Sequence, residues 1–231
     1  MKVTQSPQPT WKPGASVRSP VGEMISVDTS SLDVLSAYRL LIGSVVPRPI
    51  AFITTLSSNG TVNAAPYSSW NLVTSKPTTV VFSVAVKANG EKKDTLRNIE
   101  RTKEFVINTV AEWMVEAINH CSAEMPYGES ELTSAGFTTI PSEVVTPPRI
   151  KESPIHIECR LHSSLQVGDG APGSATLIVG EALRFHIYKP AYQDGRIAVE
   201  ELKPVSRLGG LRYGLVGDIF ELPRADIKDR G

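Results

Sequence analysis

The sequence has little cysteine, which bears first on the compartment in which the protein works. Only two cysteines, Cys121 and Cys159, occur among 231 residues. Two thiols outside a C-x-x-C spacing cannot form the disulfide framework of small secreted proteins. We therefore expect a reducing, cytoplasmic location, although one bridge between the two cysteines is still compatible with the sequence.

Long hydrophobic segments and an excess of charge are also missing. No run of about 18 apolar residues occurs, and the first thirty residues are polar, without the apolar core of a signal peptide. We expect no membrane span and no export. The 24 lysine and arginine residues balance 24 aspartate and glutamate residues, so no long-range field favours nucleic acid or an anionic membrane. Any phosphate recognition must be local.

The common short motifs of nucleotide and metal chemistry are absent. G-x-G-x-x-G, the P-loop and H-E-x-x-H do not occur, which removes the usual dinucleotide fold, P-loop enzymes and helix-borne zinc proteases. His156, Cys159 and His162 have a suggestive spacing, but strand residues three apart face opposite sides, so we expect no metal site. Cys159 is better interpreted as a core residue. No third group orients the pair His120-Cys121, and we assign no catalytic residue.

One domain preceded by an extended arm is the simplest organisation. The chain is long enough to bury one substantial core. Residues 1–30 contain four prolines among small polar residues, a composition that cannot offset the entropy of ordering. We predict an N-terminal arm over residues 1–30 and a single domain over residues 31–225. Trp11 is either docked on the body or a partner subunit, or exposed.

The first half of the domain has β-strand patterns. Residues 48–58 (RPIAFITTLSS) are rich in β-branched and aromatic side chains, and Asn59-Gly60 tolerates positive φ before TVNAAPYSSW. This combination predicts a β-hairpin. Residues 71–86 predict further strand, interrupted near Pro77 because proline removes a ladder donor. The segment 104–110 (EFVINTV) predicts another strand.

The second half predicts a long antiparallel pair. Residues 154–167 alternate, with Ile155, Ile157 and Cys159 on one face and polar residues on the other, as expected of a half-buried strand. The loop GDGAPGS connects it to a return strand over residues 175–188. Five or more strands with few helices indicate a mainly β protein, a barrel formed mostly by antiparallel pairing.

Two segments have helical spacing. Residues 92–103 place Leu96 and Ile99 on one face, with Asp94 or Thr95 as the expected cap, and residues 111–125 predict a second helix. The N–H groups and dipole at the first helix's start favour an anion, and Lys93 adds charge. The alternative is that the polar groups only cap the helix while the lysines are solvated.

Many hydroxyl, amide and cationic groups gather near the predicted strand ends and this helix start. Such a set suits a ligand with several hydroxyl groups and one phosphate. The residues are Arg48, Thr54, Thr55, Asn63, Ser68, Ser69, Ser83, Lys93 and Thr95.

Three sequence blocks together resemble a known family. The strings SVVPRPIAFITTLSSNGTVNAAPYSSWNLVTSKPTTVVFSV, KKDTLRNIERTKEFVINTV and PVSRLGGLRY, in this order, are similar to the flavin reductase-like family, which includes flavoredoxin. The match spans about residues 35–220, and its blocks fall at the family's separations. The resemblance implies an FMN-binding split β-barrel with a few short helices, usually a homodimer with its flavin sites near the interface.

The resemblance also implies a set of cofactor-binding residues. Thr54, Thr55, Asn63, Ala64, Ala65, Ser68 and Ser69 would lie beside the isoalloxazine and ribityl chain, and Lys93, Asp94 and Thr95 at the phosphate. Arg48 would be a second cation for that phosphate, and Arg207, Gly209, Gly210 and Tyr213 would close the site from the C-terminal side. Ser83 also belongs to the predicted cofactor-binding set. Because a flavin itself carries the hydride chemistry, the absence of a catalytic triad is expected.

Three functions stay open at this point. The first is an oxidoreductase in which NADH or NADPH reduces FMN and the electrons pass to an acceptor such as a partner monooxygenase. The second is a flavoredoxin-like electron carrier that holds FMN without pyridine-nucleotide activity. The third is a β-barrel interaction module that has lost its flavin.

Overall fold

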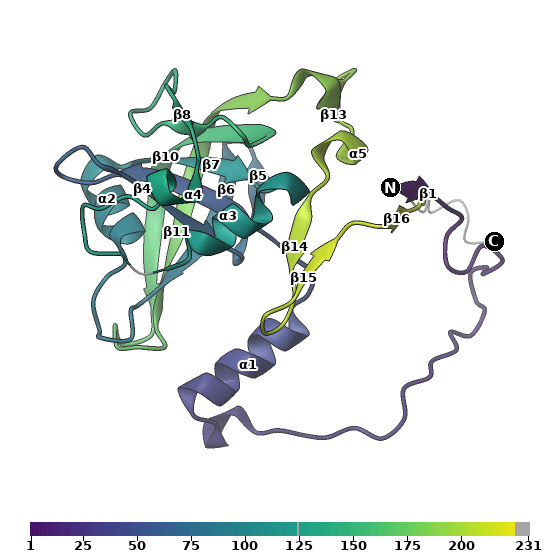
Figure 1. Cartoon of the computed structure of the whole chain (residues 1–231). Coiled ribbons are helices and arrows are strands. Elements are labelled where there is room, and N and C mark those ends of the chain that lie inside the picture. Colours follow the sequence, from purple (N-terminus) through teal and green to yellow (C-terminus); the bar gives the residue numbers. More distant parts are fainter. Residues whose placement is uncertain (124, 225–231) are drawn as a thin grey trace.

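A seven-stranded sheet forms the centre of the molecule (Figure 1). The computed structural model describes residues 1–123 and 125–224 of the chain. Within them, the sheet has the order β4-β3-β7-β10-β11-β6-β5, and every neighbouring pair is antiparallel. Its strands are β3 (Ala51–Leu56), β4 (Val62–Tyr67), β5 (Trp70–Ser75), β6 (Thr78–Ala85), β7 (Glu104–Thr109), β10 (Ile155–Val167) and β11 (Ala175–Ile187).

The two edges of this sheet are held close to each other by the chain itself. Strands β4 and β5 lie at opposite edges, yet only Ser68 and Ser69 separate them in sequence. The sheet must therefore curl until its edges meet, and the Ser83 amide donates to the Ser69 carbonyl at 3.2 Å beside this junction. No ladder joins β4 to β5 among the described residues. The predicted split β-barrel with a few short helices is thus confirmed.

Strand alternation gives the curled sheet two cores. Along β3, Ile53 packs inside the barrel with the rings of Phe82 and Phe105, whose centroids are 5.4 Å apart. Its neighbour Phe52 points to the other face and packs with Ile118. This outer core is covered by short helices after β7: η2 (Glu112–Met114), α3 (Val115–His120) and α4 (Leu132–Ala135).

The first predicted helix forms, but its start differs from the prediction. Helix α2 (Asp94–Thr102) buries Leu96 and Ile99 as expected. The expectation that Asp94 or Thr95 caps it is wrong, because Lys93 occupies the N-cap position and no side chain caps the helix. The Thr95 hydroxyl accepts a hydrogen bond from the barrel instead, as described below.

The second predicted helix is shorter than expected. Residues 111–125 contain η2 and α3, which ends at His120. At the start of the prediction, Ala111 is extended because it forms a bridge with Pro204, and the Glu112 amide donates to Lys203. Residue 124 of that prediction lies outside the described residues.

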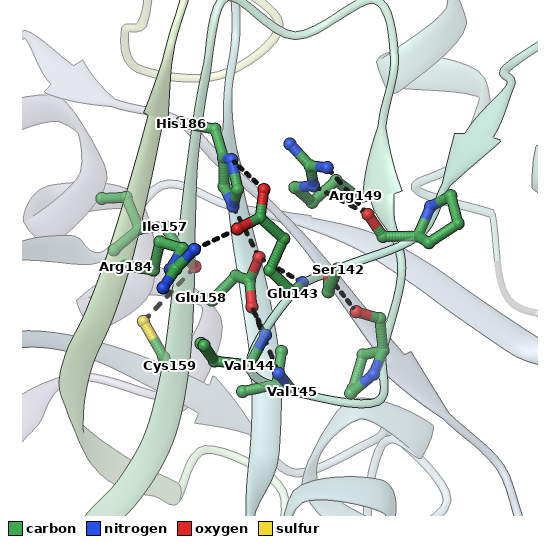
Figure 2. Close-up of polar contacts among 12 residues, drawn as sticks. Ser142, Glu143, Val144, Val145, Arg149, Ile157, Glu158, Cys159, Arg184 and His186 are labelled. Carbon is green, nitrogen blue, oxygen red and sulfur yellow. Dashed lines mark hydrogen bonds and ion pairs between the residues drawn. The ribbon is translucent and has the colours of Figure 1, made fainter.

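Strand β10 corrects a second prediction. Its polar face was expected to be exposed, but His156 is only 7% exposed and Glu158 is fully buried. The segment from β8 (Thr139–Ile140) to β9 (Arg149–Ile150) crosses this face and covers it. The Glu158 carboxylate accepts the amides of Glu143, Val144 and Val145 from that segment at 2.9, 2.6 and 3.1 Å (Figure 2). Long-range pairing therefore buries a charge that alternation alone would leave in water.

The N-terminal part lies outside the barrel. Helix α1 (Val34–Ser44) projects from the sheet in Figure 1, and its first turn is capped by Asp33, which accepts the Ser36 amide at 2.8 Å. Before it come η1 (Thr29–Ser31) and a long extended segment whose β1 (Lys2–Val3) pairs in parallel with β16 (Asp218–Ile219). The arm boundary at residue 30 and the domain limit at residue 225, which falls outside the described residues, stay predictions.

The C-terminal part returns beside α1. Strand β14 (Val205–Arg207) pairs with β15 (Tyr213–Leu215) and with β2 (Arg48–Pro49). The connection from β11 to β14 consists of η3 (Lys189–Ala191), β12 (Tyr192–Gln193), β13 (Arg196–Ile197) and α5 (Val199–Leu202).

Over the described ranges, no helix has both the length and the apolar character needed to cross a membrane.

Candidate functional site

Two adjoining cavities open along β4 and the residues after α3. They share the lining residues Pro66 and Ser122, so they are immediate neighbours. The first, which we name the α2 cavity, has a volume of about 110 Å³, and the second, the Arg207 cavity, about 230 Å³. The α2 cavity is lined by Asn63, Ala65, Tyr67, Lys87, Lys93, Asp94, Thr95, Cys121, Ala123, Met125 and Glu131, and the Arg207 cavity by Tyr38, Ile50, Ser68, Ile118, Asn119, Arg207 and Tyr213.

A buried amide network fixes the wall of the α2 cavity. The Asn63 side-chain amide donates to Thr55 at 3.2 Å and to Thr95 at 3.1 Å. Asn98, one turn further along α2, donates to the same Thr55 hydroxyl at 3.0 Å. Buried polar groups joined in this way hold one geometry, because leaving any of them unpaired is costly. The first turn of α2 is thereby tied to β3 and β4.

The α2 cavity has the charges of an anion site. Lys87 and Asp94 pair at 3.5 Å with both side chains largely buried, and Lys93 lines the same cavity. The amides of Asp94 and Thr95 belong to the first turn, where N–H groups have no partner in the helical ladder. Helix α2 is nine residues long, so its positive end adds to the field of the two lysines. The arrangement favours a compact anion such as a phosphate.

Glu131 is a second carboxyl in the α2 cavity. It is buried, and its Oε2 accepts the Ala64 amide at 3.5 Å. Burial raises the pKa of this carboxyl, and the nearby Asp94 raises it further. The shift moves Glu131 toward its uncharged form. Such a shift reduces the negative charge that would oppose an anion in this cavity.

The Arg207 cavity has an aromatic and cationic wall. The Arg207 guanidinium lies 4.3 Å from the centre of the Tyr213 ring, across the β14–β15 pair. The Tyr213 hydroxyl donates to Asn119 at 2.9 Å, which joins the C-terminal hairpin to α3. A fixed ring beside a cation offers a surface for a planar ligand. Residues far apart in sequence therefore complete one hollow.

The structure brings together part of the predicted set. The residues that line the two cavities are Asn63, Ala65, Ser68, Lys93, Asp94, Thr95, Arg207 and Tyr213. Thr55 lies behind them, bonded to Asn63. Their contact with a ligand stays a prediction.

Other predicted residues lie elsewhere. The Thr54 hydroxyl donates to Pro148 on the other face of β3, and Ala64 packs in the outer core. Ser83 donates its hydroxyl to Ser69 at 2.8 Å, so these two close the barrel junction. Their contact with a flavin stays a prediction.

Arg48 and the two glycines serve the packing of α1. The Arg48 guanidinium donates to the carbonyls of Ile42 and Val45 at the end of α1. The side chain predicted as a second cation for the phosphate is therefore hydrogen-bonded to α1. A Cβ at Gly209 would lie 3.2 Å from the Cα of Gly43, so close approach to α1 requires glycine there. Gly210, at φ +63°, forms the turn that follows.

Several cavity residues escaped the sequence analysis. Tyr67 lies inside the NAAPYS block, so its position was available, and its hydroxyl is buried without a hydrogen bond within the described residues. Lys87 follows β6 and is placed only by its ion pair with Asp94. Cys121 lies at the end of α3 and Glu131 directly before α4, and local periodicity does not show that both face the same cavity.

Comparison with known proteins identifies the family. Residues 42–199 match the family model described as the flavin reductase like domain. A Halalkalibacterium halodurans protein is 43% identical over 204 residues, covering 88% of this chain and 98% of its own. The chain belongs to the flavin reductase-like family.

Solved structures agree with this assignment. Nitrilotriacetate monooxygenase component B from Bacillus cereus is 41% identical with a TM-score of 0.84, covering 87% of this chain and 100% of its own. The 2-nitrobenzoate 2-nitroreductase NbaA of Pseudomonas fluorescens is 32% identical with a TM-score of 0.79, covering 88% and 98%.

The cavity residues fit a flavin that carries a phosphate. Lys93, the first-turn amides of α2 and the unpartnered hydroxyl of Tyr67 suit a phosphate and a polar chain. The adjoining Arg207 cavity, with its tyrosine and arginine, suits the planar ring. The donor set thus matches the two chemically different ends of one ligand.

Proposed function

We propose that the protein is an FMN-dependent oxidoreductase that takes electrons from NADH or NADPH and passes them to a downstream acceptor. The reaction is NAD(P)H plus H⁺ plus FMN giving NAD(P)⁺ plus FMNH₂. The bound flavin supplies the hydride chemistry. The chain supplies the anion site at α2, the polar chain of contacts along β4 and the aromatic wall at Arg207.

The two neighbouring cavities carry this proposal. Groups that suit a phosphate line one of them, groups that suit a planar ring line the other, and both include Pro66 and Ser122. No catalytic triad is needed, because the protein has only to orient the flavin and exclude water. The family assignment supports the same ligand class.

A fluorescence titration followed by a turnover assay tests the proposal. The purified full chain, titrated with FMN, is expected to quench flavin fluorescence saturably and to oxidise NADH or NADPH above a no-protein control. Saturable FMN binding without oxidation of either nucleotide would favour the electron carrier. Absence of FMN binding would contradict both and favour a module that has lost its flavin.

We also propose a monooxygenase as acceptor, since the Bacillus cereus structure is a monooxygenase component. Reduced flavin would pass from this protein to such a partner.

The two free cysteines, both buried in the described structure, agree with the proposed cytoplasmic location.

Glu131→Gln should tighten FMN binding relative to the unmodified protein as the pH rises. Because the pKa of Glu131 is raised, rising pH adds a negative charge beside Asp94. That charge opposes the phosphate, and glutamine cannot acquire it. We expect the ratio of dissociation constants, unmodified protein over variant, to be larger at pH 8.5 than at pH 5.5, and to reach roughly three- to tenfold once the carboxyl is fully charged.

Because both proteins are measured at the same pH, the titration of the FMN phosphate affects both dissociation constants equally and cancels in their ratio. Glu129→Gln is the matched control, because Glu129 is exposed two residues away and does not line the cavity. A ratio for Glu131→Gln that stays constant across this pH range would contradict the assigned charge state.

We propose that the working form is a homodimer. Leu41 on α1 and Leu72 on the edge strand β5 are 63% and 77% exposed, and β5 has one unpaired edge among the described residues. Such apolar surface and a free strand edge are commonly covered by a second copy.

Leu72→Asp should weaken this dimer. Light scattering of the unmodified protein at micromolar concentration should give twice the 25.0 kDa of the chain, and the variant should shift toward the monomer. A buried aspartate at the interface costs several kcal/mol, or on the order of a hundredfold in association. Leu222→Asp, 69% exposed near the end of the described chain, is the control. A monomeric unmodified protein would overturn the proposal.

A further inference from the structure

A separate cavity of about 550 Å³ lies between the second half of α1 and the turn that joins β14 to β15. We name it the Arg39 cavity. It shares no lining residue with the α2 cavity or the Arg207 cavity. It is lined by Arg39, Ile42, Gly43, Val46, Leu208, Gly209, Gly210 and Arg212. Both charged residues of this lining are arginines, so the described residues bring no carboxylate into the cavity.

Arg39 and Arg212 have no carboxylate partner in the described structure. Both residues are exposed, and the arginine ion pairs among the described residues are those of Arg97 and Arg184 instead. The acidic group that Arg39 influences is Asp33, the N-cap of α1. Hydrogen bonds within the first turn of α1 are the main reason that the pKa of Asp33 is lowered, and the charge of Arg39 contributes least. The two guanidinium groups therefore keep their capacity to bind an anion.

Two more arginines lie beside this cavity, directly opposite each other. Arg48 on β2 and Arg207 on β14 are register partners. Side chains at such positions of neighbouring antiparallel strands lie on one face, where like charges repel. Arg48 donates to the carbonyls of Ile42 and Leu208, which line the cavity, and Arg207 lies over the Tyr213 ring. With the two arginines of the lining, they give this region a positive field that favours an anionic ligand.

Glycines let a ligand approach the backbone of the turn between β14 and β15. Gly210 has φ +63°, and a Cβ there would meet nothing within 4 Å, so space is open beside it. The Arg212 amide donates to the Gly209 carbonyl at 3.4 Å, whereas the Gly210 amide has no backbone partner among the described residues. A free amide donor in a lining with two guanidinium groups suits the oxygens of a phosphate.

Three segments connect the Arg39 cavity to the Arg207 cavity. In each segment, one residue lines one cavity and its neighbour in sequence lines the other. These pairs are Tyr38-Arg39, Arg207-Leu208 and Arg212-Tyr213. Consecutive Cα atoms are about 3.8 Å apart, so the two cavities are neighbours. A ligand longer than a single ring can therefore contact both.

We propose that the Arg39 cavity binds a phosphate group of the pyridine nucleotide that donates electrons to the flavin, an identification of the ligand that rests on the proposed function. The phosphate lies at Arg39 and Arg212, and the nicotinamide reaches the flavin ring at the Arg207 cavity. Guanidinium groups match phosphate oxygens in charge and in geometry. The phosphate is either the diphosphate, which NADH and NADPH share, or the 2′-phosphate of NADPH.

Steady-state kinetics of Arg212→Ala test the proposal and separate the two phosphate sources. We expect KM for the nucleotide to rise at least about tenfold, with the FMN dissociation constant changed less than about twofold. A rise for both NADH and NADPH assigns the cavity to the diphosphate, and a rise for NADPH alone assigns it to the 2′-phosphate. An unchanged KM for both nucleotides, or an equal loss of FMN binding, would overturn the proposal.

Calorimetric titration at saturating FMN tests the site without turnover. The probes are ADP with the diphosphate, 2′,5′-ADP with the 2′-phosphate, and adenosine with neither. We expect at least one phosphate-bearing probe to bind about tenfold tighter than adenosine, and Arg212→Ala to remove that difference. This result supports the site even if neither nucleotide is oxidised, in which case only the proposed function fails. Equal affinities for all three probes, or an Arg212→Ala protein that binds them like the unmodified one, would contradict the phosphate site and leave the proposed function standing.

Arg196→Ala is the matched control, because it removes the same charge elsewhere. Arg196 is exposed on β13, which is far from α1 in Figure 1, and it lines neither the Arg39 cavity nor the Arg207 cavity. Its replacement should change KM and probe binding less than about twofold. Effects equal to those of Arg212→Ala would indicate a loss of net charge rather than binding in the Arg39 cavity, and would count against the proposal.

Discussion

Lys93→Ala is expected to weaken FMN binding about 10- to 100-fold while leaving riboflavin binding unchanged. Lys93 lines the α2 cavity at the start of α2, where the phosphate is proposed to lie. A charge-assisted hydrogen bond contributes about 1.5–3 kcal/mol, which corresponds to this range. Riboflavin lacks the phosphate, so a change confined to FMN assigns Lys93 to that group. Fluorescence titration with the two flavins measures both constants.

Lys92→Ala is the matched control for this experiment. Lys92 is adjacent in sequence but exposed, and it pairs with Glu100 at 2.7 Å rather than lining the cavity. Its replacement should change FMN affinity less than about twofold, because exposed ion pairs contribute little. If Lys93→Ala weakened riboflavin as much as FMN, the phosphate would have to lie elsewhere.

Glu158→Gln is expected to lower the midpoint of thermal unfolding by roughly 6 to 20 °C. The Glu158 carboxylate accepts hydrogen bonds from backbone amides, whereas one end of a glutamine side chain is an N–H₂ donor that would face these amide donors. His186 would also lose its charged partner. Breaking a buried pair by removing one partner costs about 3–5 kcal/mol, and each kcal/mol shifts a domain of this size about 2–4 °C. Circular dichroism during heating measures the midpoint.

The acid dependence of stability provides a second test of how Glu158 stabilises the fold. Burial alone would raise its pKa, but the amides of Glu143 and Val144 and the ring of His186 lower it below the ordinary 4.5. A lowered pKa stabilises the fold above about pH 4.5, and this stabilisation is lost as the pH falls through the folded value. The difference between the unmodified protein and Glu158→Gln should therefore shrink in acid.

Glu143→Gln provides the comparison for both measurements. Glu143 is half-exposed and pairs with Arg184, so its loss should shift the midpoint by only a few degrees at most. A Glu158→Gln variant as stable as Glu143→Gln would show that the buried cluster contributes no net stability.

The strands and their faces could be predicted because they follow from local patterns. The alternation around Ile155 and Ile157 places them in the barrel core, and the Asn59-Gly60 turn forms the expected hairpin. Helix α2 was predicted from the spacing of Leu96 and Ile99. In each case neighbouring residues alone determine the element.

What depends on distant segments could not be predicted. The burial of Glu158 requires the segment between β8 and β9, and the shortened second helix requires the pairing of Ala111 with Pro204. Arg48 was predicted as a second cation for the phosphate. Its hydrogen bonds to the carbonyls of α1 could not be predicted, because they depend on how α1 packs. Glu131 enters the α2 cavity from an irregular segment. These features are set by tertiary contacts.

The parallel pairing of β1 with β16 has a consequence for engineering. Because Lys2 lies opposite Asp218, the first residues of the chain lie beside a segment close to the end of the described structure. A short linker could join these regions, and new ends could be opened at the exposed turn of Asp194 and Gly195, outside the seven-stranded sheet. A second protein could then be fused at that turn, which would leave the pairing of β1 with β16 intact.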